Sequence, residues 1–132
     1  MLKYLNLRAC EQISSLEPIA ECTRLQYLDL GLCRYIYSLE PLARCAMLQH
    51  LILWQCRGIT SVEPLVYCTS LRSLDLSECP ASDTIFLLKA CSNLALLKLC
   101  RLRMRYGSNK DQLQAMVEQL QKDLPHLVIE LN

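Results

Sequence analysis

A repeat of 23 residues organises most of this chain and constrains its fold more than any other feature. Residues 2–24, 25–47, 48–70 and 71–93 align without a gap. Each row opens with the pattern LxxLxL, carries a cysteine at its ninth position and carries another at its twenty-first. A fifth row opens at Leu94 with LALLKLC. Periods of about 20 to 50 residues are typical of solenoids, in which a row buries its apolar face only by stacking on its neighbours.

The leucines of each row predict a short β-strand at its start. In the second row, Leu28 and Leu30 fall on one face of an extended segment and are expected to enter the core. Tyr27, Asp29 and Gly31 alternate with them and point to the other face. Neighbouring strands would pair in parallel, about 4.8 Å apart, and form one sheet.

A Glu-Pro pair recurs in the second half of each of the first three rows. Proline suits the first position of a helix, where its missing N–H group costs no hydrogen bond. These pairs therefore predict short helical turns on the side opposite the sheet: Glu17-Pro18, Glu40-Pro41 and Glu63-Pro64. The fourth row lacks the proline, and Asp83 is the candidate N-cap of a longer helix there.

The period ends after the fifth strand, and a C-terminal cap is expected in its place. Residues 111–123 put four apolar side chains on one helical stripe, namely Leu113, Met116, Val117 and Leu120. Pro125 ends this helix, and the LxxLxI pattern that opens at Leu124 predicts a last strand. Residues 94–132 would thus form a longer fifth repeat and a cap over the last apolar face, within a single domain of residues 1–132.

The LxxLxL opening followed by a turn cysteine resembles the leucine-rich-repeat family, in its cysteine-containing variety. Rows of 23 residues are shorter than the usual cysteine-containing type of F-box proteins. The LEPL segment is similar to the short-repeat arrays of kinetoplastid and phosphatase-regulatory repeat proteins. The resemblance spans essentially the whole chain. It implies an α/β solenoid with a curved parallel sheet on the concave face and short helices or turns on the convex face. It also implies a protein partner, whose identity it does not give.

The charge balance argues against an electrostatic nucleic-acid or membrane surface. Lys and Arg total 14 against 13 Asp and Glu, whereas such surfaces need a marked excess of basic residues. No apolar run approaches the length of about 20 residues that a membrane span requires. The N-terminus also lacks the pattern of a signal peptide. We therefore expect an intracellular, cytoplasmic protein, an expectation that a secreted parent with a removed N-terminus would defeat.

The nine cysteines are expected to be reduced, because their number is odd and eight of them follow the repeat. They form two columns, Cys10, Cys33, Cys56 and Cys79, and Cys22, Cys45, Cys68 and Cys91. A metal site is the alternative, but zinc needs ligands that converge on one point, whereas a column spreads them along an axis. We therefore expect the thiols to be buried as small apolar groups, those at the strand exits bonding weakly to the turn backbone of the adjacent row. We expect no metal and no cofactor. Cys100 falls on an outward strand position, and its reactivity stays open.

The outward strand positions form the candidate binding surface, because solenoids commonly bind on their concave face. They include the single tryptophan of the chain, and Trp and Tyr dominate the energetics of protein interfaces. Acidic side chains, with Arg8, would rim this aromatic patch. The predicted protein-binding residues are Tyr4, Tyr27, Asp29, His50, Ile52, Trp54 and Asp75. The alternative for Trp54 is that its ring packs on its own neighbours.

An enzymatic function is not expected. Ser73 neighbours His50 in one outward column, but hydrolysis needs a nucleophile, a base and an orienting third group, and the sequence shows no carboxylate relay. With only 3 glycines, the chain also has no Gly-rich phosphate loop.

Two other features suggest different surfaces. Leu2, Leu5 and Leu7 open the first row with no polar cap before them, so the chain is either a fragment of a longer array or a homo-oligomer that pairs through this edge. Arg101, Arg103 and Arg105 follow the fifth strand together with Lys98 and Lys110, and they either bind an acidic partner segment or lie in a solvated loop. 

Overall fold

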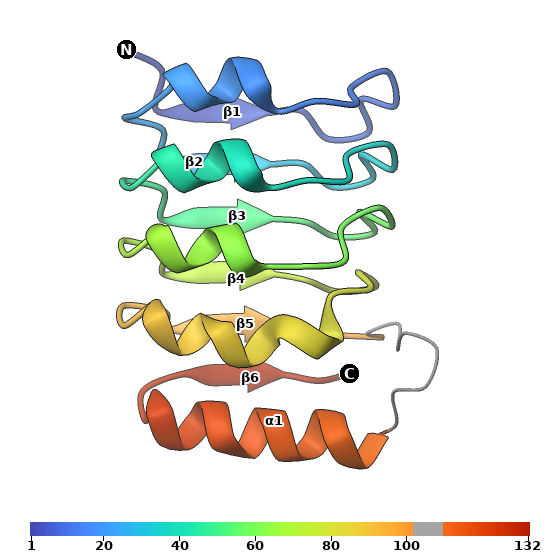
Figure 1. The fold of residues 1–132 in the computed structure, drawn as a ribbon, viewed down its shortest axis with the longest axis vertical. Coiled ribbons are helices and arrows are strands. Elements are labelled where there is room, and N and C mark those ends of the chain that lie inside the picture. The colour runs from blue at the N-terminus through green and yellow to red at the C-terminus, as the bar shows by residue number, and fades with distance from the viewer. Residues whose placement is uncertain (102–109) are drawn as a thin grey trace.

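The chain folds as a solenoid built on one six-stranded parallel sheet (Figure 1). The structure, a computed structural model, describes residues 1–101 and 110–132. The strands follow one another in chain order, each next to its predecessor. They are β1 (Tyr4–Asn6), β2 (Tyr27–Asp29), β3 (His50–Ile52), β4 (Ser73–Asp75), β5 (Leu96–Lys98) and β6 (Val128–Glu130).

Equivalent positions of the predicted rows stand side by side. Tyr4 pairs with Tyr27, Tyr27 with His50, and His50 with Ser73. The same column continues through Leu96 to Val128. The repeat of 23 residues is therefore the structural repeat from β1 to β5, and the strand predicted near the C-terminus joins the same sheet as β6.

The core lies between the sheet and the opposite wall, as the alternation of leucines predicts. Leu28 and Leu30 of the second row are fully buried, with exposed fractions of 0%. Leu39 and Leu42 approach them from the other wall and are equally buried. Because each row contributes the same aliphatic side chains, one continuous cluster runs through the stack and continues into α1 (Lys110–Asp123).

The Glu-Pro pairs begin short 3-10 helices on the wall opposite the sheet. These are η1 (Glu17–Glu21), η2 (Glu40–Arg44) and η3 (Glu63–Tyr67), each with proline in its first turn. A serine hydroxyl two residues before each glutamate accepts the glutamate N–H at 3.1 Å, from Ser15, Ser38 and Ser61. The predicted helical turns are confirmed.

The fourth row forms a longer 3-10 helix, η4 (Ser82–Ala90), as predicted, but the predicted N-cap is wrong. The N-cap residue is Ala81, with no side-chain capping bond, so Asp83 lies inside the first turn. Thr84 fixes this end instead. Its hydroxyl donates to the Ala81 carbonyl at 3.1 Å and accepts the N–H of Val62 in the row before at 3.0 Å.

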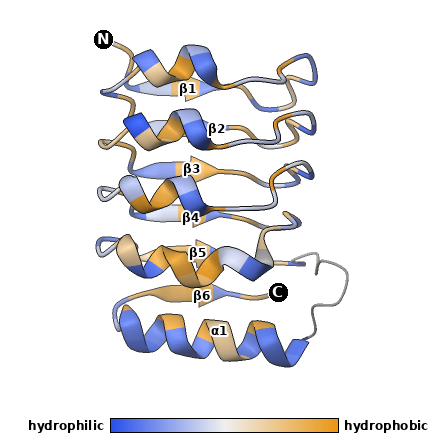
Figure 2. Ribbon diagram, in the orientation of Figure 1, coloured by the Kyte–Doolittle hydropathy of each residue, from blue (hydrophilic) through white to orange (hydrophobic). Residues whose placement is uncertain are grey.

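The C-terminal helix lies where the apolar stripe predicts it. Val117 and Leu120 are buried, while Leu113 and Met116 pack against the same core from its margin. The rest of α1 is hydrophilic (Figure 2). The helix packs against η4, so it covers the core of the last rows on the side opposite the sheet.

A left-handed residue follows the strand segment of every row, at its eighth position. The φ angles are positive at Ala9 (61°), Leu32 (66°), Gln55 (54°), Glu78 (59°) and Arg101 (50°). Residues other than glycine pay about 1 kcal/mol or more for this conformation. The turn persists because the N–H of this residue reaches the next row, as when Leu32 donates to the Trp54 carbonyl at 2.8 Å.

Candidate functional site on the outer sheet face

The outer sheet face, which is the face predicted to be concave, begins with a column of aromatic rings. The rings of Tyr4 and Tyr27 stack with centroids 4.3 Å apart and planes 5° from parallel. The ring of His50 follows, 6.4 Å from that of Tyr27 and tilted by 49°. His50 Nδ1 then lies 2.7 Å from the Ser73 hydroxyl. In-register pairing thus brings together four outward residues that the sequence places 23 positions apart.

Burial raises the pKa of the Tyr27 phenol, and the adjacent Tyr4 and Asp29 raise it further. The ring of Tyr27 is half-buried between its two neighbours, whereas Tyr4 at the margin is 59% exposed. Tyr27 is therefore a neutral, fixed part of the surface at physiological pH.

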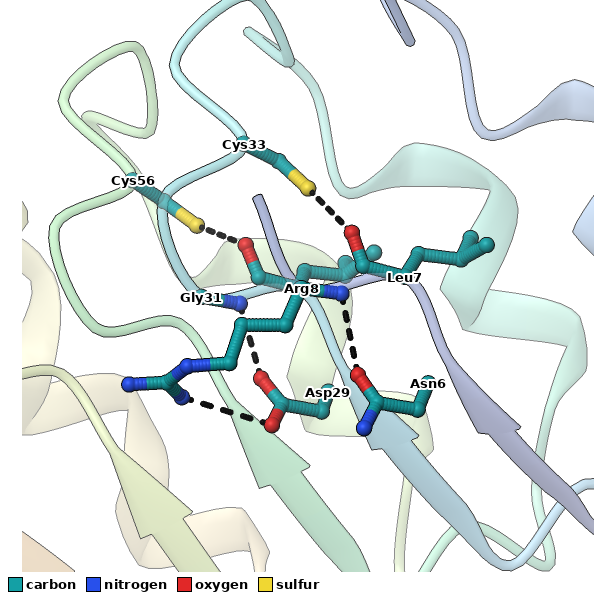
Figure 3. A network of polar contacts seen from close by, with 8 residues as sticks. Asn6, Leu7, Arg8, Asp29, Gly31, Cys33 and Cys56 are labelled. Atoms are coloured by element: carbon teal, nitrogen blue, oxygen red, sulfur yellow. Dashed lines mark hydrogen bonds and ion pairs between the residues drawn. The ribbon is translucent and has the colours of Figure 1, made fainter. Parts of the chain in front are cut away.

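Arg8 organises the next part of the face (Figure 3). Its Nη1 lies 3.4 Å from Asp29 Oδ2, and its Cζ lies 4.7 Å from the centre of the Trp54 ring. Gly31 makes room for this arrangement, because a Cβ there would stand 2.8 Å from Arg8 Nη1. The guanidinium thus rests on the indole, which gives partial support to the alternative that Trp54 packs on its own neighbours. Cation–π contacts of this kind are worth about 0.5 to 1 kcal/mol at exposed sites.

Asp29 was expected on the exposed rim of the aromatic patch, but the structure places it beneath the surface. Its side chain is only 7% exposed, beneath Arg8. Oδ1 accepts the N–H of Gly31 at 2.9 Å, a bond that closes the turn at the end of β2. Asp75 makes the same bond with Ser77 at 2.9 Å, but it stays half-buried at the surface. These aspartates hold the turns in place, which their outward position in the sequence does not reveal.

The buried thiols are bonded to the backbone of the preceding row, as the structural interpretation of the columns predicts (Figure 3). The Cys33 thiol donates to the Leu7 carbonyl at 3.1 Å, and the Cys56 thiol donates to the Leu30 carbonyl at 2.9 Å. Cys68 and Cys91 do the same in the second column, both at 3.3 Å. The thiols therefore tie each row to the one before it.

Burial also makes these thiols poor acids. It raises the pKa of Cys56 and of Cys68 to about 12, and that of Cys91 to about 11. The pKa of Cys79 is raised further, again chiefly by burial. Because thiolates are the reactive and metal-binding form, this burial disfavours reaction and metal binding at these cysteines in the folded chain. In the part of the chain that the structure describes, no three His, Cys, Asp or Glu side chains are grouped to hold a metal ion.

Two adjoining hollows mark the C-terminal half of the outer sheet face. A small central hollow of about 150 Å³ lies over β3, β4 and β5, lined by Leu51, Ile52, Ser73, Leu74, Asp75, Leu96 and Lys98. A wider, open groove of about 480 Å³ follows at the ends of the strands. Its walls include Arg8 and Trp54 as well as Glu78 and Arg101. Ile52, Asp75 and Lys98 line both, so the two hollows meet at these side chains.

Lys98, Glu78 and Arg101 line the groove but are not among the predicted protein-binding residues, and Lys98 and Arg101 belong instead to the separate basic cluster predicted from the sequence. A ladder of turn side chains places two of them: Gln55 Nε2 donates to Glu78 Oε2 at 2.7 Å, and Arg101 Nη1 lies 3.7 Å from Glu78 Oε1. All three of these ladder residues stand at the eighth position of their rows. Comparing that column in the sequence would have found the ladder. Arg103 and Arg105 of the predicted basic cluster lie outside the described residues.

The bond between His50 and Ser73 has the length expected of a base and a nucleophile, but it lacks the third group of a catalytic triad. Within residues 1–101 and 110–132, no carboxylate is bonded to the imidazole. Polar pairs of this kind are ordinary cross-strand contacts. The geometry therefore supplies a polar contact in the centre of the face.

Stacked parallel strands, thiol-bonded turns and 3-10 helices on the opposite wall define a leucine-rich-repeat solenoid. Its fold is similar to that of an internalin (inlF) from Listeria monocytogenes, a leucine-rich-repeat protein, with a TM-score of 0.70 and 22% sequence identity. The match covers 98% of this chain but 39% of the internalin, and at this identity it shows the fold alone. An internalin C2 from the same species matches with a TM-score of 0.49 and 19% identity, over 91% of this chain and 57% of its own. No family model and no curated protein sequence matches the chain.

The helices of the described residues do not meet the requirements of a membrane span. None of them combines the necessary length with a sufficiently apolar sequence.

Proposed function

We propose that this chain is a non-enzymatic protein-interaction module that binds a protein partner on its outer sheet face. The contact residues in this proposal are Tyr4, Tyr27, His50, Ile52, Trp54 and Asp75, with Asp29 acting indirectly by holding Arg8 over Trp54.

The observation that carries the proposal is the in-register column of rings on a rigid sheet. Tyr4 and Tyr27 are already stacked, and Trp54 is held by Arg8, so these side chains lose little conformational freedom when a partner covers them. Aromatic and arginine side chains that are fixed in this way are the typical hot spots of protein interfaces.

The first test is affinity capture from the native cell extract with two folded variants beside the wild type. One variant carries Tyr27→Ala, Ile52→Ala and Trp54→Ala. The control is Tyr67→Ala, which removes an exposed aromatic ring (62%) from η3 on the opposite wall. We expect one protein to be captured by the wild type and the control and lost with the triple variant.

The captured partner then allows a quantitative measurement. Trp54→Ala alone should weaken binding by about 2 kcal/mol, or about thirtyfold in Kd, measured by calorimetry with the purified partner. A partner that binds the triple variant as well as the wild type would refute the site, as would an equal loss with Tyr67→Ala.

The N-terminal edge suggests a second candidate function, in which this chain assembles with another copy or continues a longer array. Leu2 is 45% exposed, and Leu5 and Leu7 are only half-buried. In the second row, the equivalent residues Leu28 and Leu30 are fully buried. Apolar side chains at a sheet edge favour pairing with another strand. A mass by light scattering that stays monomeric at every concentration would refute self-association.

A further inference from the structure

The first strand of the sheet carries backbone groups on its open side. Within residues 1–101 and 110–132, the strand that pairs with β1 is β2 alone. The Leu7 N–H donates to the Asp29 carbonyl of the second row at 2.8 Å. Because successive residues of a strand direct their backbone groups to opposite sides, the N–H and C=O groups of Tyr4 and Asn6 point away from β2. An edge of this kind pairs readily with another strand.

The C-terminal end of the solenoid is less suited to stacking on another copy. There α1 lies beyond β6 in the stack, and most of its surface is hydrophilic (Figure 1, Figure 2). Its exposed side chains include Glu118 and Lys122. Head-to-tail stacking would remove such charged side chains from water, which costs free energy. The N-terminal edge, where Leu5 and Leu7 are half-buried, is therefore the better place for a second copy.

Two copies of β1 complement each other when they run antiparallel with their Leu5 residues opposed. Tyr4 of one copy then lies opposite Asn6 of the other, and the two residues exchange both of their outward N–H···O bonds. The two Leu5 side chains face each other at the two-fold axis, in the closely spaced type of antiparallel pair. This pairing satisfies the open backbone groups and covers the apolar edge at the same time.

The charges near the edge are complementary in the same arrangement. Antiparallel pairing brings the start of one β1 beside the turn that follows β1 in the other copy. Lys3 precedes the strand, and Glu11 lies in that turn. Both side chains are exposed, and among the described residues neither forms an ion pair within the chain. The two-fold axis produces this contact between opposite charges twice.

We infer that two copies of this chain pair through β1 in an antiparallel arrangement, around a two-fold axis at Leu5. The inference rests on the second candidate function above and deepens it, because it names a second copy as the partner and gives the geometry. Opposed residues of an antiparallel pair lie on the same face of a sheet, so the two outer sheet faces join. The exposed Tyr4 rings then lie near the axis, where the aromatic columns of the two copies meet.

The inference is tested by sedimentation of the full chain over a range of concentrations, with reductant present. Tyr4→Pro removes an outward N–H from each copy and leaves the bonds to β2 in place, since proline is tolerated on edge strands. Tyr4→Ala is the matched variant, because it also loses the ring but keeps the N–H. We expect the Tyr4→Pro dimer to be about thirtyfold weaker than the Tyr4→Ala dimer, as expected for two lost hydrogen bonds.

A charge exchange gives a second readout that is independent of the proline. Lys3→Glu alone and Glu11→Lys alone each place like charges at both contacts, so each dimer should be about fivefold weaker than the wild type at low salt. An equimolar mixture of the two variants restores opposite charges at both contacts and should pair as tightly as the wild type.

The outcomes separate the geometry from self-association itself. Equal dimerisation of Tyr4→Pro and Tyr4→Ala, or a mixture no tighter than its two components, overturns the antiparallel pairing and leaves self-association standing. A wild-type chain that stays monomeric at every concentration overturns both.

Discussion

Alkaline unfolding tests whether the thiol columns hold the rows together as neutral donors. Below pH 9 both the folded and the unfolded chain keep the thiol protons. Above the ordinary thiol pKa of 9.0, the unfolded chain loses these protons, whereas folded Cys56 and Cys68, with a pKa of about 12, keep theirs. The free energy of unfolding must therefore fall as the pH rises from about 9 toward 12.

The size of this effect follows from the number of buried thiols. At pH 10 each strongly buried thiol costs the folded state about 1 to 2 kcal/mol, because ionisation of that thiol favours the unfolded chain about tenfold. Four such thiols, Cys56, Cys68, Cys79 and Cys91, together cost about 6 kcal/mol. Whole domains are stable by only about 5 to 15 kcal/mol, so this loss is large enough to measure.

The assay is urea unfolding with reductant at intervals between pH 7 and pH 10.5. Cys56→Ala should lower the free energy of unfolding at pH 7, since it removes a buried thiol and its bond to Leu30. It should also reduce the slope of that free energy against pH above pH 9, by the amount expected for about one proton fewer. Val62→Ala truncates another fully buried side chain and should lower the stability without changing that slope. A wild-type stability that is constant up to pH 10.5, or equal slopes in the two variants, would refute the reasoning.

Two further perturbations probe the core and the Arg8 cluster. Leu51→Ala, in the middle of β3 and 1% exposed, should cost about 2 to 5 kcal/mol in urea unfolding, and a cost below 1 kcal/mol would contradict the continuous core. Gly31→Ala should push Arg8 off the indole ring, with a net change in stability of less than about 1 kcal/mol because the alanine also restricts the unfolded chain. Fluorescence of Trp54, the only tryptophan, should change in that variant and should change in the same direction in Arg8→Ala. An unchanged spectrum in both would show that Arg8 does not cover the ring.

The repeat explains why so much of the architecture could be predicted. Stacking repeats the same contact at every row, so the period of the leucines indicates the strands, their parallel order and the buried face. The neighbours on the outer sheet face follow by the same logic, and Tyr4, Tyr27, His50 and Ser73 meet in the predicted column. The thiol columns were likewise correctly interpreted as buried groups bonded to turn backbone.

Single side chains were harder to predict, because their roles depend on atoms from other rows. Asp29 looks like a surface acid in the sequence, yet Arg8 covers it and the Gly31 N–H binds it. Asp83 has the residue type of an N-cap, but the bonds of Thr84 to two neighbouring segments determine where η4 begins.

The sequence by itself determined the solenoid, because apolar side chains that repeat every 23 residues are buried when each row stacks on the next. Only the tertiary structure decided which polar side chains form hydrogen bonds or ion pairs within the chain. Hydrogen bonds depend on distances of a few tenths of an ångström between rows, and no pattern of residue types encodes them. Asp29 shows the difference, since its outward position follows from the alternation of β2, whereas its contacts with Arg8 and with the Gly31 N–H follow from the packing of the first two rows.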